Sequence, residues 1–400
     1  MSDVPPFQDP AGPPAQPGTD PFDADEFGAG IGDVDDFGVS TASRLSFPTP
    51  QTPRGKRVLV TGLGSFWGGR VAQALEADPN VEIIVGLDTT EPTVELERTE
   101  YVRVDANYSI LARIVQATQV DTIIHTFLVV DPTQISRRSM HEINVIGTMN
   151  LFAAASTPMS TVRNVIVKSS TVVYGCAPED PVWFDEETPR SRSPKTAPER
   201  SLDAVEGYVR DFAEDNPHVN VTLLRFSNVI GSEIETPLTR ALQLPLVPSI
   251  LGFDPRFQFV HEDDVIRSIL FTMDNSLPGV FNVAGDGLLP WTEVAALCGK
   301  NTFPLPPYLT DWVTGPLGRV GLVDLPDDYQ SLLRYGRGVD NRRLKQQGFR
   351  YKYTSAEAVE AFIESVRLRR TLGPSENRYR YERDVEQFFR HSPAVVREKG

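Results

Sequence analysis

The stretch that most constrains the fold runs from Lys56 to Asp88, with the sequence KRVLVTGLGSFWGGRVAQALEADPNVEIIVGLD. It begins with a short apolar, β-branched run, which is typical of a strand buried on both faces. Glycines follow at Gly62, Gly64 and Gly68, and small apolar residues then recur at helical spacing. A second apolar run ends at Asp88. The stretch therefore predicts a strand, a tight turn, a helix, a second strand and an acid.

This order of elements is that of a dinucleotide-binding βαβ unit. Gly62 allows a sharp turn, Gly64 allows the backbone to approach a pyrophosphate, and Gly68 allows the helix to pack closely. The free N–H groups and the positive dipole end of the helix then attract phosphates. Asp88 is placed to accept hydrogen bonds from the adenosine ribose and would repel a 2′-phosphate, which favours NAD over NADP. The alternative for the glycines alone is an ordinary turn between a strand and a helix.

Composition excludes several classes of function. The chain has 400 residues and a formal net charge of −15, which argues against non-specific binding of nucleic acid. Its two cysteines, Cys176 and Cys298, lie in no cysteine–histidine cluster, so we expect a reducing compartment and no metal site. No signal-peptide pattern or apolar run of membrane length is present, so we expect a cytoplasmic protein without a transmembrane segment.

The two ends of the chain differ from its middle. Residues 1–54 are rich in proline and carry nine acidic and two basic side chains, so we expect a disordered acidic tail that either docks on a protein partner or stays solvated. Residues 367–400 mix basic and aromatic side chains, which suit an anionic partner, a lipid surface, the acidic tail or solvent. Between the tails, strand-like runs alternate with helical ones, such as the long helix expected at 141–155. This alternation predicts a doubly wound parallel sheet.

Seven motifs of the middle segment occur in a recognisable order and spacing. They are VLVTGLGSFWGG, DTIIH, NVIGTMNLF, SSTVVYG, LRFSNVIG, FVHEDDV and GVFNVAGDG, found between about residues 56 and 365. Together they resemble an extended, here atypical, short-chain dehydrogenase/reductase of the NAD-dependent epimerase/dehydratase type, and actinobacterial nucleotide-sugar epimerase-like members in particular. The resemblance implies an α/β Rossmann fold, with an NAD-binding domain at 55–230. It also implies a smaller substrate lobe at 231–366, whose strands return in part to the main domain.

The same resemblance implies which residues hold the cofactor. They are Gly62, Gly64, Ser65, Gly68, Asp88, Asp105, Asn144 and Arg200. Ser65 stands where the family turn has its middle glycine, and Asp105 would meet the edge of the adenine. Asn144 takes the family's helix position behind the active site. The alternative for Asp105 and Asn144 is that each caps a helix.

For the substrate, the resemblance implies three further residues. Ser170 lies four residues before Tyr174, in the position of the family's catalytic serine or threonine. Asn228 matches an asparagine near the substrate phosphates, and Arg256 stands one residue away from a phosphate-binding arginine. The alternative for Asn228 is a structural role in a turn. The alternative for Tyr174 as a catalytic phenol is packing, which we favour.

One departure from the family pattern bears directly on the chemistry. The family uses a Tyr-x-x-x-Lys pair, which helical spacing places on one face, and the lysine lowers the phenol's pKa from its free value near 10. None of the seven lysines has a tyrosine four residues before it. An ungapped register places Thr196 and Arg200 at the two positions. A threonine hydroxyl is too weak an acid for this role, whereas Arg200 can hold ribose hydroxyls or a phosphate.

Two functions therefore remain open at the level of sequence. The first is an NAD-dependent enzyme that oxidises a nucleotide sugar transiently and returns the hydride, with Ser170 orienting the substrate. The second is a non-catalytic dinucleotide-binding sensor or scaffold with two charged tails. A homodimer is compatible with either, and fold alone cannot choose between them.

Overall fold

The computed structural model describes residues 55–104, 107–129, 136–307 and 327–372. The acidic tail, Asp105 and the segment 308–326 lie outside the described residues, so the expectations for the tail and for Asp105 stay predictions. The described chain ends within a helix that extends to Leu372. The first residues of the segment expected as a basic tail are therefore helical.

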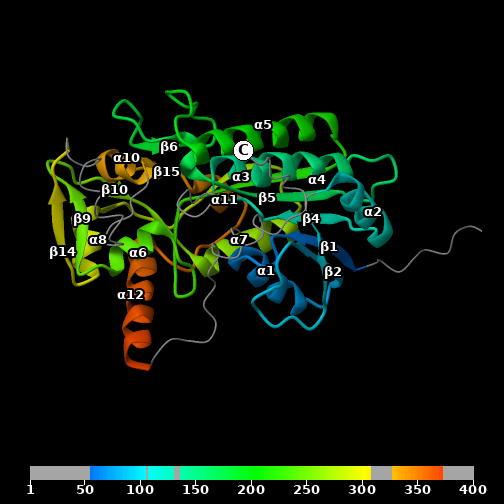
Figure 1. Ribbon diagram of the computed structural model, residues 1–400, viewed down its shortest axis with the longest axis horizontal. Coiled ribbons are helices and arrows are strands. Elements are labelled where there is room, and N and C mark those ends of the chain that lie inside the picture. The colour runs from blue at the N-terminus through cyan, green and yellow to red at the C-terminus, as the bar shows by residue number, and fades with distance from the viewer. Residues whose placement is uncertain (1–54, 105–106, 130–135, 308–326, 373–400) are drawn as a thin grey trace, which may run out of the picture. The chain divides into compact units, whose positions relative to one another are not determined.

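A seven-stranded parallel sheet lies at the centre of the fold (Figure 1). Its strand order is β12-β7-β5-β4-β1-β2-β3, and every neighbouring pair is parallel. The order reverses at β1, which is where sheets of this type bind ligands, beyond the carboxyl ends of the strands. The strands are β1 (Lys56–Thr61), β2 (Val81–Asp88), β3 (Thr99–Arg103), β4 (Thr122–His125), β5 (Asn164–Ser170), β7 (Asn220–Phe226) and β12 (Gly279–Val283). The predicted doubly wound parallel sheet is confirmed.

Helices cover both faces of this sheet, because the side chains of each buried strand alternate between two cores. On β1, Leu59 belongs to the core on one face, whereas Val58 and Val60 belong to the core on the other. The first face carries α2 (Tyr108–Thr118), α3 (Arg137–His141), α4 (Gly147–Ala155) and α5 (Ala197–Asp215), and the second carries α1 (Phe66–Glu76), α7 (Glu262–Asn275) and α11 (Arg342–Gln346) (Figure 1). A π-helical segment, Glu142–Ile146, joins α3 to α4. The helix expected at 141–155 thus begins earlier, at Arg137, and changes its winding near Asn144.

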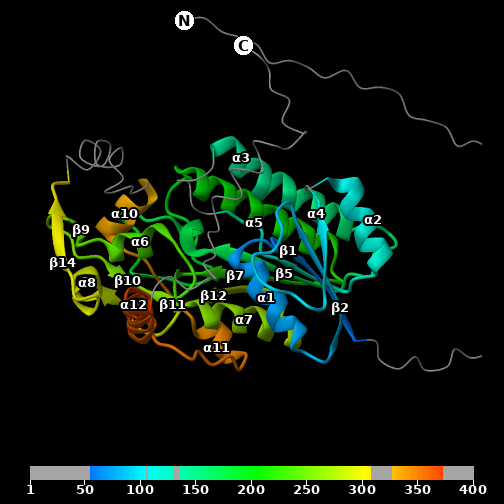
Figure 2. The ribbon, with the colours of Figure 1, turned by 60° about the horizontal axis from the view of Figure 1, so that its bottom comes forward.

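The second half of the chain builds a smaller lobe and also supplies β12 to the main sheet. The lobe has its own apolar core around Phe257, Phe259, Trp291 and Phe362. Its strands β9 and β14 lie far from β1 and β2 (Figure 2). The remaining elements are β6 (Trp183–Phe184), β8 (Asn228–Ile230), β9 (Leu246–Ile250), β10 (Arg256–Phe257), β11 (Phe259–His261), β13 (Leu289–Pro290), β14 (Asn301–Leu305), β15 (Gly338–Val339), α6 (Pro237–Gln243), α8 (Trp291–Leu297), α10 (Asp327–Tyr335), α12 (Ser355–Leu372) and the 3-10 turn Thr171–Tyr174.

Candidate functional site

The glycine turn after β1 has the geometry that the sequence predicts. Gly62 has a φ of +76°, a conformation that favours glycine. A Cβ on Gly68 would lie 2.1 Å from the carbonyl oxygen of Gly62, so the start of α1 packs directly on the turn. Ser65 is the N-cap of α1: its hydroxyl donates to Gly62 O at 2.6 Å and accepts from Gly68 N at 3.3 Å. The serine that replaces the family's middle glycine therefore stabilises the turn from within.

Asp88 closes the turn from the end of β2. One carboxylate oxygen accepts from Gly64 N at 2.9 Å, and the other accepts from the N–H groups of Thr89 and Thr90 at 2.6 and 3.2 Å. Burial raises the pKa of this carboxyl above its ordinary value, while these N–H groups act in the opposite direction. A Cβ on Gly64 would lie 2.4 Å from the Thr90 hydroxyl, so the missing side chain makes room for Thr90. The predicted acid thus lies beside the predicted phosphate turn.

Asn144 holds the chain that follows β4. It is fully buried in the π-helical segment, where its side-chain oxygen accepts from Val129 N at 2.8 Å and its nitrogen donates to Val129 O at 2.7 Å. This pair of hydrogen bonds fixes the backbone of residue 129 as a neighbouring strand would. Asn144 therefore holds the backbone after β4 from inside the π-helical segment and is not a helix cap, while its predicted place behind the active site stays a prediction.

Lys168 is a buried cation that the sequence analysis did not single out. Its side chain extends from β5, is 4% exposed and donates to Leu128 O at 2.9 Å. The ammonium lies 4.6 Å from the ring centroid of Trp67, which in turn stacks on Phe226 with centroids 5.8 Å apart. A lysine inside an apolar strand, VIVKSS, was the available signal, because lysine is seldom fully buried without a specific reason.

A cavity of about 100 Å³, named here the Ser170 cavity, lies beside this lysine. It opens at the carboxyl ends of β5 and β7, and its lining residues are Trp67, Lys168, Ser169, Ser170, Thr171, Val172, Phe226, Ser227, Asn228, Val229, Ile234, Thr236, Leu238, Tyr329, Leu332 and Arg337. The Ser170 hydroxyl donates to Phe226 O at 3.4 Å, and the Asn228 amide donates to Gln258 O at 2.9 Å. The Ser227 hydroxyl is buried and has no hydrogen-bond partner among the described residues. Two predicted site residues, Ser170 and Asn228, are therefore brought together.

The start of α5 carries neither a phenol nor a lysine. Thr196 is the N-cap of this helix: its hydroxyl accepts from Glu199 N at 3.3 Å, and the Glu199 carboxylate accepts from Thr196 N at 3.2 Å. Arg200 is exposed on the first turn and donates to Lys195 O at 2.5 Å. Neither Arg200 nor Arg256, which is exposed on β10, lines the Ser170 cavity. Their predicted roles toward cofactor and substrate stay predictions.

Tyr174 is buried in a packing role. Its ring stacks on Phe184 with centroids 4.8 Å apart, and its hydroxyl donates to Asn282 Oδ1 at 2.8 Å and accepts from Arg225 Nη1 at 2.8 Å. Burial raises the pKa of this phenol even though the Arg225 charge acts against the rise. These contacts agree with the structural alternative favoured from sequence. Tyr174 also lines a second cavity of about 410 Å³, named here the Arg190 cavity, together with Arg190, Lys195, Thr196 and other residues.

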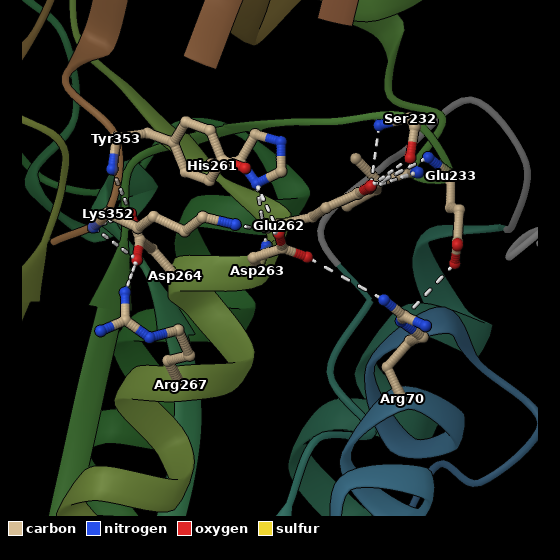
Figure 3. Close-up of polar contacts among 11 residues, drawn as sticks. Arg70, Ser232, Glu233, His261, Glu262, Asp263, Asp264, Arg267, Lys352 and Tyr353 are labelled. Atoms are coloured by element: carbon tan, nitrogen blue, oxygen red, sulfur yellow. Dashed lines mark hydrogen bonds and ion pairs between the residues drawn. The ribbon is translucent and has the colours of Figure 1, made fainter. Parts of the chain in front are cut away.

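The motif FVHEDDV spans β11 and the start of α7, where its acidic side chains make the polar contacts drawn in Figure 3. The buried Glu262 carboxylate accepts from Ser232 N at 2.7 Å, from Ile234 N at 2.9 Å and also from Glu233 N and the Ser232 hydroxyl. Arg70, on α1, lies 3.6 Å from Glu233 and 3.9 Å from Asp263. The helix that begins at the phosphate turn is therefore tied to the segment that follows β8.

In the described part of the chain, no group of three histidine, cysteine, aspartate or glutamate side chains is arranged to hold a metal ion. Among the same residues, no helix combines the length and the apolar character needed to span a bilayer.

A parallel sheet in this strand order, with a glycine turn at the reversal point and an acid at the end of β2, defines a Rossmann-type dinucleotide-binding fold. Residues 58–284 match the family model for the NAD dependent epimerase/dehydratase family, and the chain belongs to this family. It is 34% identical to the uncharacterised protein Rv0501 of Mycobacterium tuberculosis. The 334 aligned residues cover 81% of this chain and 87% of that protein.

Other relatives have assigned activities. The chain is 26% identical to the dTDP-D-glucose 4,6-dehydratase of Mus musculus, over 61% of this chain and 72% of the mouse protein. Among solved structures, the UDP-glucose 4-epimerase of Thermotoga maritima with UDP-glucose aligns with a TM-score of 0.60 and 18% identity, over 79% of this chain and 99% of that one. The structural likeness shows the shared fold.

Proposed function

We propose that this protein binds NAD along the turn from Gly62 to Gly68 and uses it to oxidise a nucleotide sugar transiently. The observation that carries this proposal is the juxtaposition of two features. Asp88 accepts from Gly64 N beside the glycine turn, an arrangement that suits the adenosine and phosphate end of a dinucleotide. Trp67, in the first turn of α1, lines the Ser170 cavity, where the other end of the dinucleotide would arrive. NAD, when bound, accepts a hydride from a C–H bond of the substrate and later returns it.

The residues of this chain would then divide the work. The N–H groups at the start of α1 hold the phosphates, and Asp88 holds the ribose. Asn144 keeps the backbone at Val129 in place behind the cofactor, as its two hydrogen bonds support. Ser170 orients the substrate hydroxyl, with Asn228 nearby in the same cavity. Arg200 and Arg256 are proposed for the cofactor and the substrate phosphate, and Asp105 for the adenine, on the family resemblance alone.

The Ser170 cavity is smaller than the roughly 300–1,000 Å³ of most ligand pockets, so it suits the reacting end of a ligand and not a whole nucleotide sugar. Its hydroxyl-rich lining and the orphan hydroxyl of Ser227 support a polyhydroxylated group there, since a buried hydroxyl gains free energy from a partner. A second candidate is a non-catalytic dinucleotide-binding protein. The start of α5 favours it, because Thr196 and Arg200 occupy the positions where the family's phenol and lysine are expected.

The test begins with cofactor binding. Calorimetry with NAD should give a measurable affinity, and Asp88→Ala should weaken it by about 1–3 kcal/mol, as expected for loss of a hydrogen-bonding charge. Asp78→Ala is the control, because Asp78 lies between α1 and β2, far from the carboxyl ends of the strands. Unchanged affinity in Asp88→Ala would remove this acid from the site.

The second step separates the two candidate functions. Purified protein with NAD is incubated with a panel of UDP- and dTDP-sugars, and products are resolved by chromatography. Turnover that is lost in Ser170→Ala supports the enzyme. Retained NAD with no turnover on any sugar, together with loss of a partner on deletion of residues 1–54, supports the sensor or scaffold.

We also propose a homodimer and a cytoplasmic location. Exposed apolar side chains occur on α2, on the π-helical segment and on α4, and they are Tyr108, Ile110, Ile146 and Met149. Because large apolar groups that cluster at a surface often mark a contact with another chain, a second copy is a fitting partner. Sedimentation of the wild type and of Ile146→Glu tests this. The location is supported by the two cysteines, which form no disulfide with each other.

A further inference from the structure

Helix α10 lies between the two cavities and presents one phenol to each. Tyr329 and Leu332 line the Ser170 cavity, whereas Ser331, Arg334 and Tyr335 line the Arg190 cavity. Residues three or four positions apart share one face of a helix. The helix therefore places Tyr329 in the wall of the cavity that Ser169, Ser170 and Ser227 also line, although Tyr329 lies far from any Tyr-x-x-x-Lys position in the sequence.

Two basic side chains line the same cavity as this phenol. Lys168 lines the same cavity from β5, with its ammonium held by Leu128 O and the ring of Trp67. Arg337 lines it from the segment after α10 and donates through Nη1 to Thr171 O at 2.8 Å and to Gly175 O at 3.1 Å. No carboxylate is among the described residues that line this cavity. Nearby positive charge stabilises an ionised phenol, which is what a proton acceptor at this point needs.

We propose that Tyr329 and Lys168 replace the missing Tyr-x-x-x-Lys pair, with the Tyr329 phenol as the proton-transfer group and Lys168 as the cation that stabilises its phenolate. This inference rests on the function proposed above. In the oxidation that bound NAD would support, the Tyr329 phenolate would take the hydroxyl proton of a substrate alcohol. The carbon that bears this hydroxyl would give up a hydride to oxidised NAD, and a C=O bond would form. In the return step the carbon regains the hydride, the carbonyl oxygen regains the proton from Tyr329, and the alcohol is restored. Ser170 would donate a hydrogen bond to the reacting oxygen in place of its bond to Phe226 O.

The inference is tested by titrating Tyr329 itself. The near-ultraviolet absorbance of tyrosinate is followed from about pH 6 to 11 in the wild type and in Tyr329→Phe, and the difference between the two curves isolates this one phenol. We expect its midpoint to lie about 1–3 pH units below the free value near 10. Lys168→Met should move the midpoint upward by at least about one pH unit. Should that variant fail to fold, Arg337→Gln removes the other cation of the cavity and should move the midpoint in the same direction.

Tyr335→Phe is the matched control, because Tyr335 is on the same helix but faces the Arg190 cavity, and the low midpoint should persist in it. A Tyr329 midpoint at or above 10, or one that neither cation variant moves, would overturn the inference. Calorimetry with NAD on the same samples separates the two failures. Binding of NAD without a low midpoint defeats the Tyr329 and Lys168 pair and leaves NAD binding intact, whereas a low midpoint without NAD binding defeats the proposed function.

Discussion

At the scale of single residues, His125 joins the end of β1 to α4 through a hydrogen bond at each of its ring nitrogens. It ends β4 and is buried, with Nδ1 at 2.7 Å from the Thr61 hydroxyl and Nε2 at 2.9 Å from the Thr148 hydroxyl. The Thr148 hydroxyl donates its own proton to Asn144 O, so it must accept from His125. Because burial lowers the pKa of His125, the ring is neutral, its single proton is on Nε2, and Thr61 donates to Nδ1. One imidazole thus joins the strand before the glycine turn to the helix that carries Asn144.

This arrangement makes folding depend on pH. Burial, with a smaller contribution from the Lys168 charge, lowers the pKa of His125 from 6.5 to about 3. The unfolded chain takes up the proton below pH 6.5 and the folded chain does not, so the stabilisation is complete above pH 6.5 and is lost as pH falls toward 3. As the pH falls from about 7.5 to about 5, protonation of His125 in the unfolded chain should lower the unfolding free energy by about 2 kcal/mol. Urea unfolding of the wild type and of His125→Asn measures this.

The control for that experiment is His218→Asn, since His218 is exposed after α5. It should lose as much stability on acidification as the wild type does. The prediction fails if His125→Asn also loses as much, because the fall would then belong to other groups.

At the scale of elements, the start of α5 decides between two interpretations of Thr196. The sequence register places Thr196 where the family has its phenol, whereas the structure makes it the N-cap of a 19-residue helix. A cap acts through the backbone, so its loss should reduce stability without changing the crevice. We predict that Thr196→Ala lowers the unfolding free energy by about 1 kcal/mol and leaves NAD affinity unchanged. Thr196→Ser keeps a capping hydroxyl and should restore most of the stability. Thermal unfolding measures the stability of each variant, and calorimetry measures its affinity for NAD. A fall in NAD affinity in both variants would show that Thr196 belongs to the cofactor site.

Elements defined by local pattern could be predicted from the sequence, and those defined by distant contacts could not. The unit from β1 to β2 follows from an apolar run, three glycines and an acid within one short stretch. The Ser170 cavity instead depends on Lys168 meeting the backbone at Leu128 and on Tyr329 arriving from α10, and nothing local to either residue encodes these contacts. The π-helical winding at Asn144 could not be predicted from the sequence either, because the side chain of Asn144 bonds to a distant partner, the backbone of Val129. Irregular helical winding of this kind is frequent at functional sites.

At the scale of the whole described body, the two lobes are joined by β12 in the main sheet and by the start of α7. The carboxylate of Glu262 gathers the N–H groups of Ser232, Glu233 and Ile234, and Gly231 leaves room for it, since a Cβ there would lie 2.1 Å from the Glu262 carboxyl carbon. This loop leads from β8 toward the smaller lobe, while α7 packs on the main sheet. A single buried side chain therefore fixes how the chain leaves one lobe for the other.

We predict that Glu262→Gln lowers the unfolding free energy by about 2–4 kcal/mol, because the amide keeps one acceptor oxygen and places an N–H₂ group against N–H donors. Glu235→Gln, in the same loop, is the control and should change stability by no more than about 0.5 kcal/mol. Urea unfolding followed by far-ultraviolet circular dichroism measures the effect. Tryptophan fluorescence of two variants, one that keeps only Trp67 and one that keeps only Trp291, gives one signal for the main domain and one for the core of the smaller lobe. If the link couples the lobes, the two signals coincide in the wild type and separate in Glu262→Gln. Signals that already separate in the wild type would show that the lobes unfold independently and that Glu262 stabilises only its own loop.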